Sequence, residues 1–156
     1  PGGPSAEGET PPQPANSMTP DALATLHART FTAPAPWSAA SFAGLLASPL
    51  VFLSADPQGR SFALGRVIAD EAELLTLATD PGARRLGLAR ARLEGFDAAA
   101  RARGAVTAFL EVAEDNAPAR ALYAACGWQP RGRRPGYYVA PTGARVAALI
   151  LCKSLA

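Results

Sequence analysis

The segment from residue 72 to residue 125 alternates strand, helix, strand and helix, and this alternation constrains the fold most strongly. The apolar stretches 72–79 and 106–113 have the length and composition of buried strands, and 117–125 is predicted to be a helix. Between the strands runs a helical pattern whose apolar positions recur every three or four residues: Leu86, Ala89, Leu93, Phe96 and Ala100. Two strands joined through a helix cannot form a hairpin, so the pattern predicts a parallel pair of neighbouring strands in one sheet.

Shorter elements flank this unit on both sides. Thr19 and Ser38 are good capping residues, and they predict one helix that begins at Pro20 and a second that follows Ser38. The remaining strands are predicted at 50–55, 62–68, 128–133 and 146–151. The first two are joined by a turn containing Pro and Gly, and together with 72–79 they predict an antiparallel meander. The sheet is therefore expected to be mixed.

Length and composition are typical of one globular domain. With 156 residues, of which 49% are hydrophobic and 18% charged, the chain has room for a single domain. Residues 1–17 are rich in Pro and contain no large apolar side chain, so they are predicted to be a disordered tail or a tag remnant. The folded domain is expected over residues 18–156.

The sequence argues against membranes, nucleic acids and metal ions as partners. No apolar run reaches the ~18 residues of a membrane span, and nothing at the start has the pattern of a secretion signal. A net charge of +2 is too small to argue for nucleic acid. Cys126 and Cys152 lack the spacing of metal ligands and are expected to be free thiols. We therefore expect a cytoplasmic protein, a monomer or weak dimer, without metal, membrane or direct nucleic-acid contacts.

The turn that opens the first predicted helix of this unit is a candidate anion site. Residues 84–89 follow a strand, and the free N–H groups and the positive dipole end of a helix start attract anions. Gly87 lets the backbone approach a phosphate closely, and the small Ala89 lets the helix pack tightly on the sheet. The alternative is a solvated helix cap, since the chain has neither a dinucleotide-binding nor a P-loop fingerprint.

Three side chains farther along the chain have the chemistry of a catalytic site. Glu111 is a carboxylate inside an apolar strand, where partial removal from water suits a general base. Asn116 and Tyr123 are seven positions apart and are expected to share one helix face. The alternatives are an exposed strand end for Glu111, a helix cap for Asn116 and a core aromatic for Tyr123. The lone His27 lies on an apolar helix face and is expected to be structural.

The joint spacing of these motifs resembles the GNAT superfamily of N-acetyltransferases, whose cofactor signature is Gln/Arg-x-x-Gly-x-Gly/Ala. The matching residues are Leu77 to Pro81, Arg84 to Arg90, Leu110 to Val112, Asn116, Leu122-Tyr123 and Gly127-Trp128. Three further segments resemble the bacterial ribosomal-protein alanine N-acetyltransferases: Pro36-Trp37-Ser38 with Phe42, Asp70-Glu71-Ala72, and Arg133 to Tyr138. The resemblance covers residues 18–156. Its departures are Ala89 for a second Gly, Trp128 for Phe, and Pro135-Gly136 before the tyrosines.

The resemblance implies a fold and a cofactor. The implied fold is α/β, with a mixed, mostly antiparallel central sheet of about six or seven strands. A splayed parallel pair lies in the middle of this sheet, and helices cover both faces. Acetyl-CoA is the implied co-substrate, and no metal is implied. The implied cofactor-binding residues are Leu77, Ala78 and Thr79 through their backbone, the turn residues Arg85, Leu86, Gly87, Leu88, Ala89 and Arg90, and Asn116.

The resemblance also implies an activity. Glu111 is the implied general base and Tyr123 the implied general acid of a direct acetyl transfer. The implied acceptor is the N-terminal alanine of a small-subunit ribosomal protein, bound by Trp37, Arg134, Tyr137 and Tyr138. Two alternatives stay open: the same chemistry on lysine side chains or small amines, and a non-catalytic acyl-CoA-binding module. The segment 131–138 is interpreted either as a solvated loop or as the wall of a peptide groove.

Overall fold

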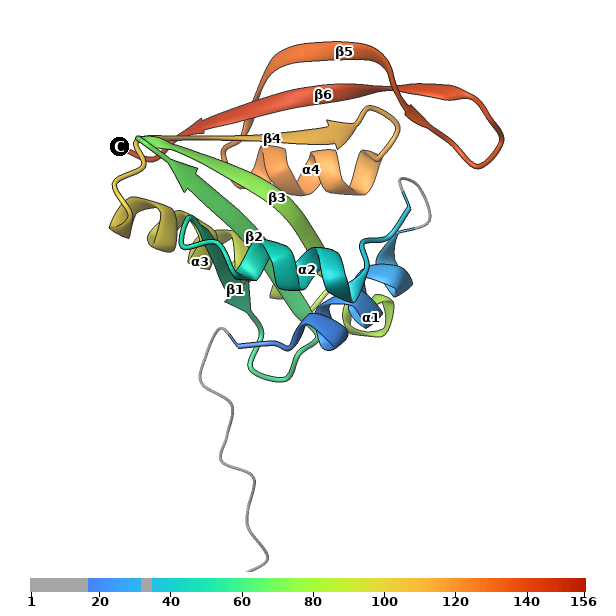
Figure 1. The fold of residues 1–156 in the computed structure, drawn as a ribbon. Coiled ribbons are helices and arrows are strands. Elements are labelled where there is room, and N and C mark those ends of the chain that lie inside the picture. Colours follow the sequence, from blue (N-terminus) through green and yellow to red (C-terminus); the bar gives the residue numbers. More distant parts are fainter. Residues whose placement is uncertain (1–16, 32–34) are drawn as a thin grey trace, which may run out of the picture.

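The computed structural model of the chain describes residues 17–31 and 35–156. The predicted disordered tail therefore lies, apart from Ser17, outside the described residues. Figure 1 shows how the helices and strands of the described chain are arranged. In chain order they are α1 (Pro20–Thr30), α2 (Ala39–Leu46), β1 (Val51–Ala55), β2 (Ser61–Ile68), β3 (Glu71–Thr79), the 3-10 helix η1 (Pro81–Ala83), α3 (Leu88–Ala102), β4 (Thr107–Ala113), α4 (Ala117–Ala125), β5 (Gln129–Val139) and β6 (Arg145–Ser154).

The strands form one six-stranded mixed sheet in the order β1-β2-β3-β4-β6-β5. β3 and β4 run parallel, and the other neighbouring pairs are antiparallel. The parallel pair is the one that α3 connects, because a strand that returns through a helix can run in the same direction as its neighbour. The predicted mixed sheet with one parallel pair in its middle is thereby confirmed.

The sheet carries a hydrophobic core on each face. β2 shows the division, because Phe62 and Leu64 pack in the core with α1 and α2, whereas Ala63 and Val67 pack in the core with α3. Successive side chains of a strand point to opposite faces, so a strand that is apolar at consecutive positions supplies both cores. Figure 1 shows α2 in front of the sheet and α3 behind it. Helices thus cover both faces, as predicted.

A bulge in β3 coincides with the end of its pairing with β4. The parallel ladder joins residues 71–73 to residues 107–109 and goes no farther along the described strands. Leu75 is then skipped in the ladder with β2, whose register shifts between Leu64 and Gly65. A bulge bends its strand and increases the local twist. The carboxyl halves of β3 and β4 diverge beyond this point (Figure 1), which is the predicted splayed pair.

The helix α3 begins later than the sequence predicts. The predicted start lay at Arg84 to Leu86, but the first helical residue is Leu88. Arg85 and Gly87 have φ values of 67° and 74°, and such left-handed residues cannot be part of a right-handed helix. The predicted inward position of Leu86 is also wrong, since this side chain is 62% exposed.

β5 is longer than predicted. The prediction ended at residue 133, yet the strand continues through Pro135 and Gly136 to Val139. β5 lies at the edge of the sheet, where a Pro without an N–H group is tolerated. The register with β6 shifts between Arg134 and Tyr138, and this irregularity accommodates the two residues. The segment 131–138 is therefore a strand rather than a solvated loop.

No helix in the described ranges, 17–31 and 35–156, is long and apolar enough to cross a membrane. Cys126 and Cys152 are both free thiols, as predicted. Within the same ranges, no group of three or more His, Cys, Asp or Glu side chains is placed to hold a metal ion.

His27 joins α1 to β3 and to the segment before α2. Its Nδ1 accepts a hydrogen bond from the backbone N–H of Trp37 at 3.0 Å, so the ring proton resides on Nε2. Nε2 lies 3.1 Å from Oγ1 of Thr76, and the ring stacks on Phe31 with centroids 4.3 Å apart. The side chain is only 2% exposed, and burial lowers its pKa to about 4. His27 is a structural, neutral histidine, as predicted.

Acidification should destabilise the protein through His27. A histidine in the unfolded chain has a pKa of about 6.5, whereas burial lowers the pKa of His27 in the folded protein to about 4. The unfolded state therefore binds the proton first, so stability present above pH 6.5 is lost progressively as the pH falls toward 4. We expect the free energy of unfolding, measured with urea, to fall by about 2 kcal/mol between pH 7 and pH 5.

The sequence supplies a clean control, because His27 is its only histidine. His27→Gln should lower stability at pH 7, since a buried network loses hydrogen bonds. Between pH 7 and pH 5, however, the variant should lose much less stability than the parent protein. If the parent protein and His27→Gln lost equal stability between pH 7 and pH 5, the pH dependence would come from groups other than His27.

Candidate active site

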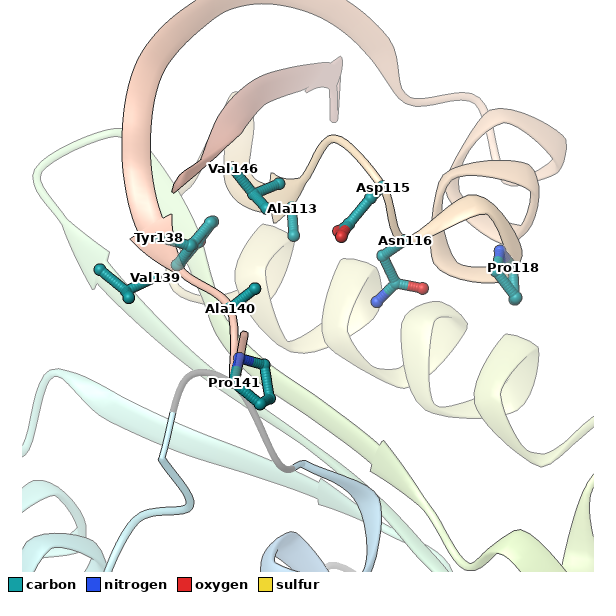
Figure 2. Close-up of a pocket in the computed structure, with 9 residues that line it drawn as sticks. All are labelled: Ala113, Asp115, Asn116, Pro118, Tyr138, Val139, Ala140, Pro141 and Val146. Carbon is teal, nitrogen blue, oxygen red and sulfur yellow. The ribbon is translucent and has the colours of Figure 1, made fainter. Parts of the chain in front are cut away.

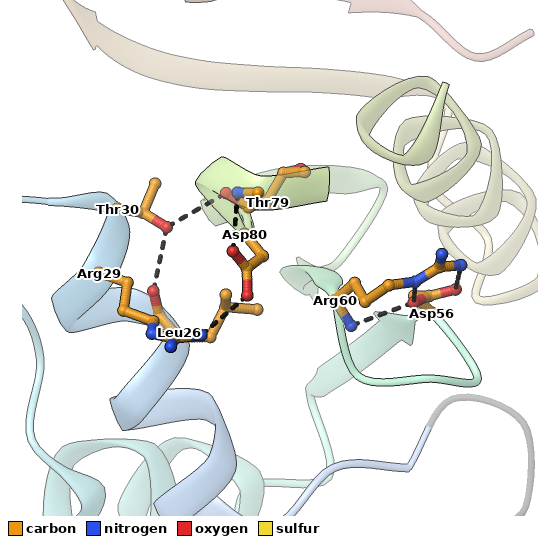
Figure 3. A network of polar contacts seen from close by, with 8 residues as sticks. Leu26, Arg29, Thr30, Asp56, Arg60, Thr79 and Asp80 are labelled. Carbon is orange, nitrogen blue, oxygen red and sulfur yellow. Dashed lines mark hydrogen bonds and ion pairs between the residues drawn. The ribbon is translucent and has the colours of Figure 1, made fainter. Parts of the chain in front are cut away.

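Two hydroxyl groups, of which that of Ser61 is buried, contact the carboxyl end of β3. Oγ of Ser61, which is fully buried, donates to the carbonyl oxygen of Ala78 at 2.9 Å. From α1, the single O–H of Thr30 is shared between the carbonyl oxygens of Leu26, at 3.0 Å, and Thr79, at 3.4 Å (Figure 3). These bonds hold the strand segment 77–79, which the sequence predicts to bind the cofactor, against β2 and α1. Nothing in the sequence identifies Thr30 or Ser61, because their partners lie 49 and 17 positions away.

Asp80 links α1 to the loop that follows β3. One of its carboxylate oxygens accepts from the N–H of Gly82 at 2.9 Å, and the other accepts from Nη1 of Arg29 at 2.9 Å (Figure 3). The Arg29 side chain is 62% exposed, so the ion pair contributes less than about 1 kcal/mol to stability. Its effect is geometric, because it fixes where the loop leaves the sheet. The Asp-Pro-Gly sequence indicates this turn but not its arginine partner.

The loop before α3 presents free backbone N–H groups. The first bond of the helix runs from the N–H of Ala91 to the carbonyl of Gly87 at 3.0 Å. Within the described residues, the N–H groups of Leu88, Ala89 and Arg90 therefore have no acceptor, and no side chain caps the helix. The left-handed Arg85 adds to this arrangement, since successive amides around such a residue form a concave anion site. The free N–H groups at the start of α3 support the predicted anion site, which stays a prediction.

Glu111 lies on β4, just beyond the point where β3 and β4 separate. The predicted alternation holds, because Ala108, Leu110 and Val112 are buried in the core with α3, whereas Glu111 lies on the other face. Its side chain is 23% exposed and lies 3.3 Å from Nη1 of Arg134. A half-buried carboxylate that still reaches the surface can accept a proton from a substrate.

Tyr123 lies on α4 and is only 8% exposed. Its ring contacts Trp128 edge to face, with centroids 6.1 Å apart, so it belongs to the core. Burial raises the pKa of Tyr123 well above its ordinary value of 10, and Cys126 and Tyr138 add to this effect. Its hydroxyl has no hydrogen-bond partner among the described residues, so it is available to a ligand.

Asn116 caps α4 and borders a cavity. Its side-chain oxygen accepts from the N–H of Ala119 at 3.2 Å, as the capping interpretation predicts. The predicted common face with Tyr123 is wrong, because Asn116 precedes the helix with φ −83° and ψ 74° and is exposed. A cavity of about 350 Å³ lies beside it, between the start of α4 and the β5–β6 hairpin. Figure 2 shows Asn116 and Tyr138 on opposite sides of this cavity.

β5 brings an arginine and two tyrosines to this region. The guanidinium carbon of Arg134 lies 5.4 Å from the ring centroid of Tyr137. The rings of Tyr137 and Tyr138 meet edge to face at 5.0 Å. Burial raises the pKa of Tyr138, and the negative charge of Glu111 raises it further. Glu111, Arg134 and the two tyrosines therefore form one cluster.

Trp37 is not part of this cluster. It stacks on His27 at 5.2 Å and contacts Phe42 at 5.5 Å, in the core with α1 and α2. The structure thus groups three of the four predicted acceptor-binding residues around Glu111 and gives the fourth a packing role of its own. The residues Asp115, Pro141 and Val146, which also line the cavity, carry no motif that would mark them in the sequence.

Known proteins match the chain over most of its length. Residues 26–128 match the acetyltransferase (GNAT) family. The [ribosomal protein bS18]-alanine N-acetyltransferase of Salmonella typhimurium is 38% identical over 110 residues, which are 69% of this chain and 74% of that protein. The protein of the same name from Escherichia coli (strain K12) is 36% identical over 118 residues, 74% of this chain and 79% of that protein.

Solved structures agree with these matches. The crystal structure of the ribosomal-protein-S18-alanine N-acetyltransferase from Escherichia coli is similar with a TM-score of 0.79 and 31% identity, over 88% of both chains. Arabidopsis thaliana NAA60 in complex with acetyl-CoA shares the fold, with a TM-score of 0.74 and 15% identity over 87% of this chain and 93% of that chain. The chain therefore belongs to the acetyltransferase (GNAT) family, and it is an acyltransferase that uses acetyl-CoA.

Proposed function

We propose that this protein acetylates the α-amino group of the N-terminal alanine of ribosomal protein bS18, in the cytoplasm. Relatives that are 36–38% identical to the chain are [ribosomal protein bS18]-alanine N-acetyltransferases, which supports this acceptor. The observation that carries the proposal is the cluster of Glu111, Arg134 and Tyr138 beside the diverging ends of β3 and β4. A carboxylate at that place can receive the proton of an amine that attacks a thioester.

The residues around the splayed strands fit acetyl-CoA, which supplies a thioester and an anionic pyrophosphate. We propose that the backbone N–H groups of 85–90 hold the pyrophosphate at the start of α3. The unpaired edge of 77–79, held in place by Thr30 and Ser61, would bind the pantetheine arm in the manner of an added strand. Asn116 is exposed at the cavity and is available to the same arm.

We propose that Glu111 is the general base. An N-terminal ammonium has a reference pKa near 8 and must lose a proton before its nitrogen can attack a carbonyl. The strand β4 fixes the position of Glu111, which pairs with Ile150 of β6 in the sheet. Its partial exposure lets an amine or one bridging water reach the carboxylate.

We propose that Tyr123 is the general acid. The departing thiolate needs a proton, and a phenol is a suitable donor. Because burial raises the pKa of Tyr123, the phenol stays protonated at physiological pH. The surrounding core, including Trp128, restrains the ring and therefore the direction of its hydroxyl.

The acceptor peptide is proposed to bind against β5 with its amino group toward Glu111. Arg134, Tyr137 and Tyr138 would line the path of its first residues, and Trp37 would support the segment before α2 from the core with α1 and α2. The small side chain of alanine suits a site that is bounded by aromatic rings. The protein is proposed to act as a monomer or weak dimer, without direct nucleic-acid contacts.

A peptide panel tests this function. We expect kcat/KM for acetyl transfer to be highest with an N-terminal Ala, in peptides that differ only at the first residue. A blocked peptide with one lysine should react about 10²-fold more slowly at pH 7.5, because a lysine with a pKa near 10.4 has far less free amine. If the enzyme preferred the lysine peptide or small amines, the proposed N-terminal alanine acceptor would be wrong. Binding of acetyl-CoA in calorimetry without transfer to any amine would indicate a non-catalytic acyl-CoA-binding module.

A further inference from the structure

Arg134 contacts Glu111 through the longest ion pair among the residues that the structure describes. Nη1 of Arg134 lies 3.3 Å from Oε1 of Glu111. The other ion pairs in the described ranges measure 2.5–2.9 Å. A single contact of this length is easily exchanged for another partner, especially because 54% of the Arg134 side chain is exposed to water.

The neighbouring Arg133 forms a shorter ion pair on the same strand. Arg133 also has 54% of its side chain exposed, yet both its Nε and its Nη2 lie 2.8 Å from Oε2 of Glu114. Residue type, exposure and strand are the same for the two arginines. The loose contact between Arg134 and Glu111 is therefore a property of this position, not of exposed arginines on β5 in general.

Arg134 has a second interaction partner, the ring of Tyr137. Its guanidinium lies over the ring of Tyr137, where a cation is attracted by the electrons of the aromatic face. Tyr137 lies in the stretch where the register with β6 shifts, between Arg134 and Tyr138, and Gly136 beside it has a φ of 60°. A guanidinium that leaves Glu111 can therefore stay near the site without being fully transferred to water.

We propose that Arg134 is a replaceable counterion of Glu111, which the incoming ammonium of the acceptor displaces. This inference rests on the proposed role of Glu111 as the base that receives the acceptor. In the free enzyme a half-buried carboxylate is stabilised by a nearby cation. Two cations on one carboxylate repel each other, so the acceptor's ammonium must compete with Arg134. Arg134 is thus a positioning residue that sets the affinity for a primary ammonium and takes no part in the chemical step.

Arg134→Gln tests the competition. Because the displaced contact is an exposed ion pair, we expect the KM for an Ala-starting peptide to fall by about two- to fivefold, with kcat and the KM for acetyl-CoA unchanged. The difference from the parent enzyme should shrink at high salt, which screens exposed charges. A purely structural role for Arg134 predicts no such gain in apparent affinity. An unchanged or higher peptide KM, or a lower kcat, would overturn the proposal.

Two matched variants complete the experiment. Arg133→Gln removes a neighbouring arginine of equal exposure, and it should leave the peptide KM unchanged if the effect belongs to the contact with Glu111. Arg134→Lys retains the charge and should return the KM toward the parent value. A decrease in KM with Arg133→Gln, or no recovery with Arg134→Lys, would contradict a counterion role.

This experiment is separate from the test of the proposed function. The peptide panel identifies which amine the parent enzyme acetylates. The ratio of the KM values of Arg134→Gln and the parent enzyme is then measured with that amine, whichever it is. If another amine is the preferred acceptor, only the proposed function is corrected. If the ratio of the KM of Arg134→Gln to that of the parent enzyme is one or more, only the counterion role of Arg134 is overturned.

Discussion

Glu111→Gln should lower kcat for acetyl transfer by about 10²-fold or more, with the KM for acetyl-CoA nearly unchanged. Gln has the shape of Glu and keeps the strand pairing with Ile150, but it cannot accept the proton of an ammonium. The remaining rate should rise with pH as the acceptor, with a reference pKa near 8, supplies its own free amine. Steady-state kinetics over a range of pH measures both effects.

Glu114→Gln is the matched control for this variant. Glu114 lies three positions beyond Glu111, and its side chain is 40% exposed and paired with Arg133. Both substitutions break one ion pair to an arginine whose side chain is 54% exposed, which contributes about 1 kcal/mol or less to stability, so neither should unfold the protein. Normal turnover in Glu111→Gln, or an equal loss in Glu114→Gln, would remove Glu111 from the role of base.

Tyr123→Phe should also lower kcat by about 10²-fold, because the departing thiolate would lose its proton donor. The substitution keeps the ring and its contact with Trp128 at 6.1 Å. The hydroxyl has no hydrogen-bond partner among the described residues, so its removal should change the free energy of unfolding by less than about 1 kcal/mol. Kinetics and thermal unfolding of the same sample therefore separate a catalytic loss from a loss of structure.

The pH dependence provides a second check on the acid. Burial raises the pKa of Tyr123 well above 10, so the parent enzyme should not lose kcat through ionisation of this phenol below about pH 10. Tyr138 is the comparison, because it lines the cavity and its pKa is also raised, by burial and by the charge of Glu111. A large loss of kcat in Tyr138→Phe combined with normal turnover in Tyr123→Phe would transfer the role of acid to Tyr138.

Local sequence patterns predict most of the secondary structure. α4 occupies Ala117–Ala125, the range predicted, because capping and periodicity are local properties. The alternation in β4 assigns Glu111 to the face opposite Leu110 for the same reason. The predictions are wrong where a residue adopts a backbone conformation that its type rarely takes, and where the place of a strand in the sheet decides how far it extends. Arg85 in the left-handed region delays α3, and an edge position lets β5 continue through Pro135.

The sequence by itself therefore determined the order of strands and helices, the parallel pair around α3 and the family, all of which follow from residue types at short, regular spacings. Only the tertiary structure decided how the site is assembled. The bulge at Leu75 lies where β3 and β4 diverge, Ser61 and Thr30 contact the end of β3, and Arg134 contacts Glu111. These contacts join residues 17 to 49 positions apart or depend on a shift of strand register, and neither is visible in a local pattern of side chains.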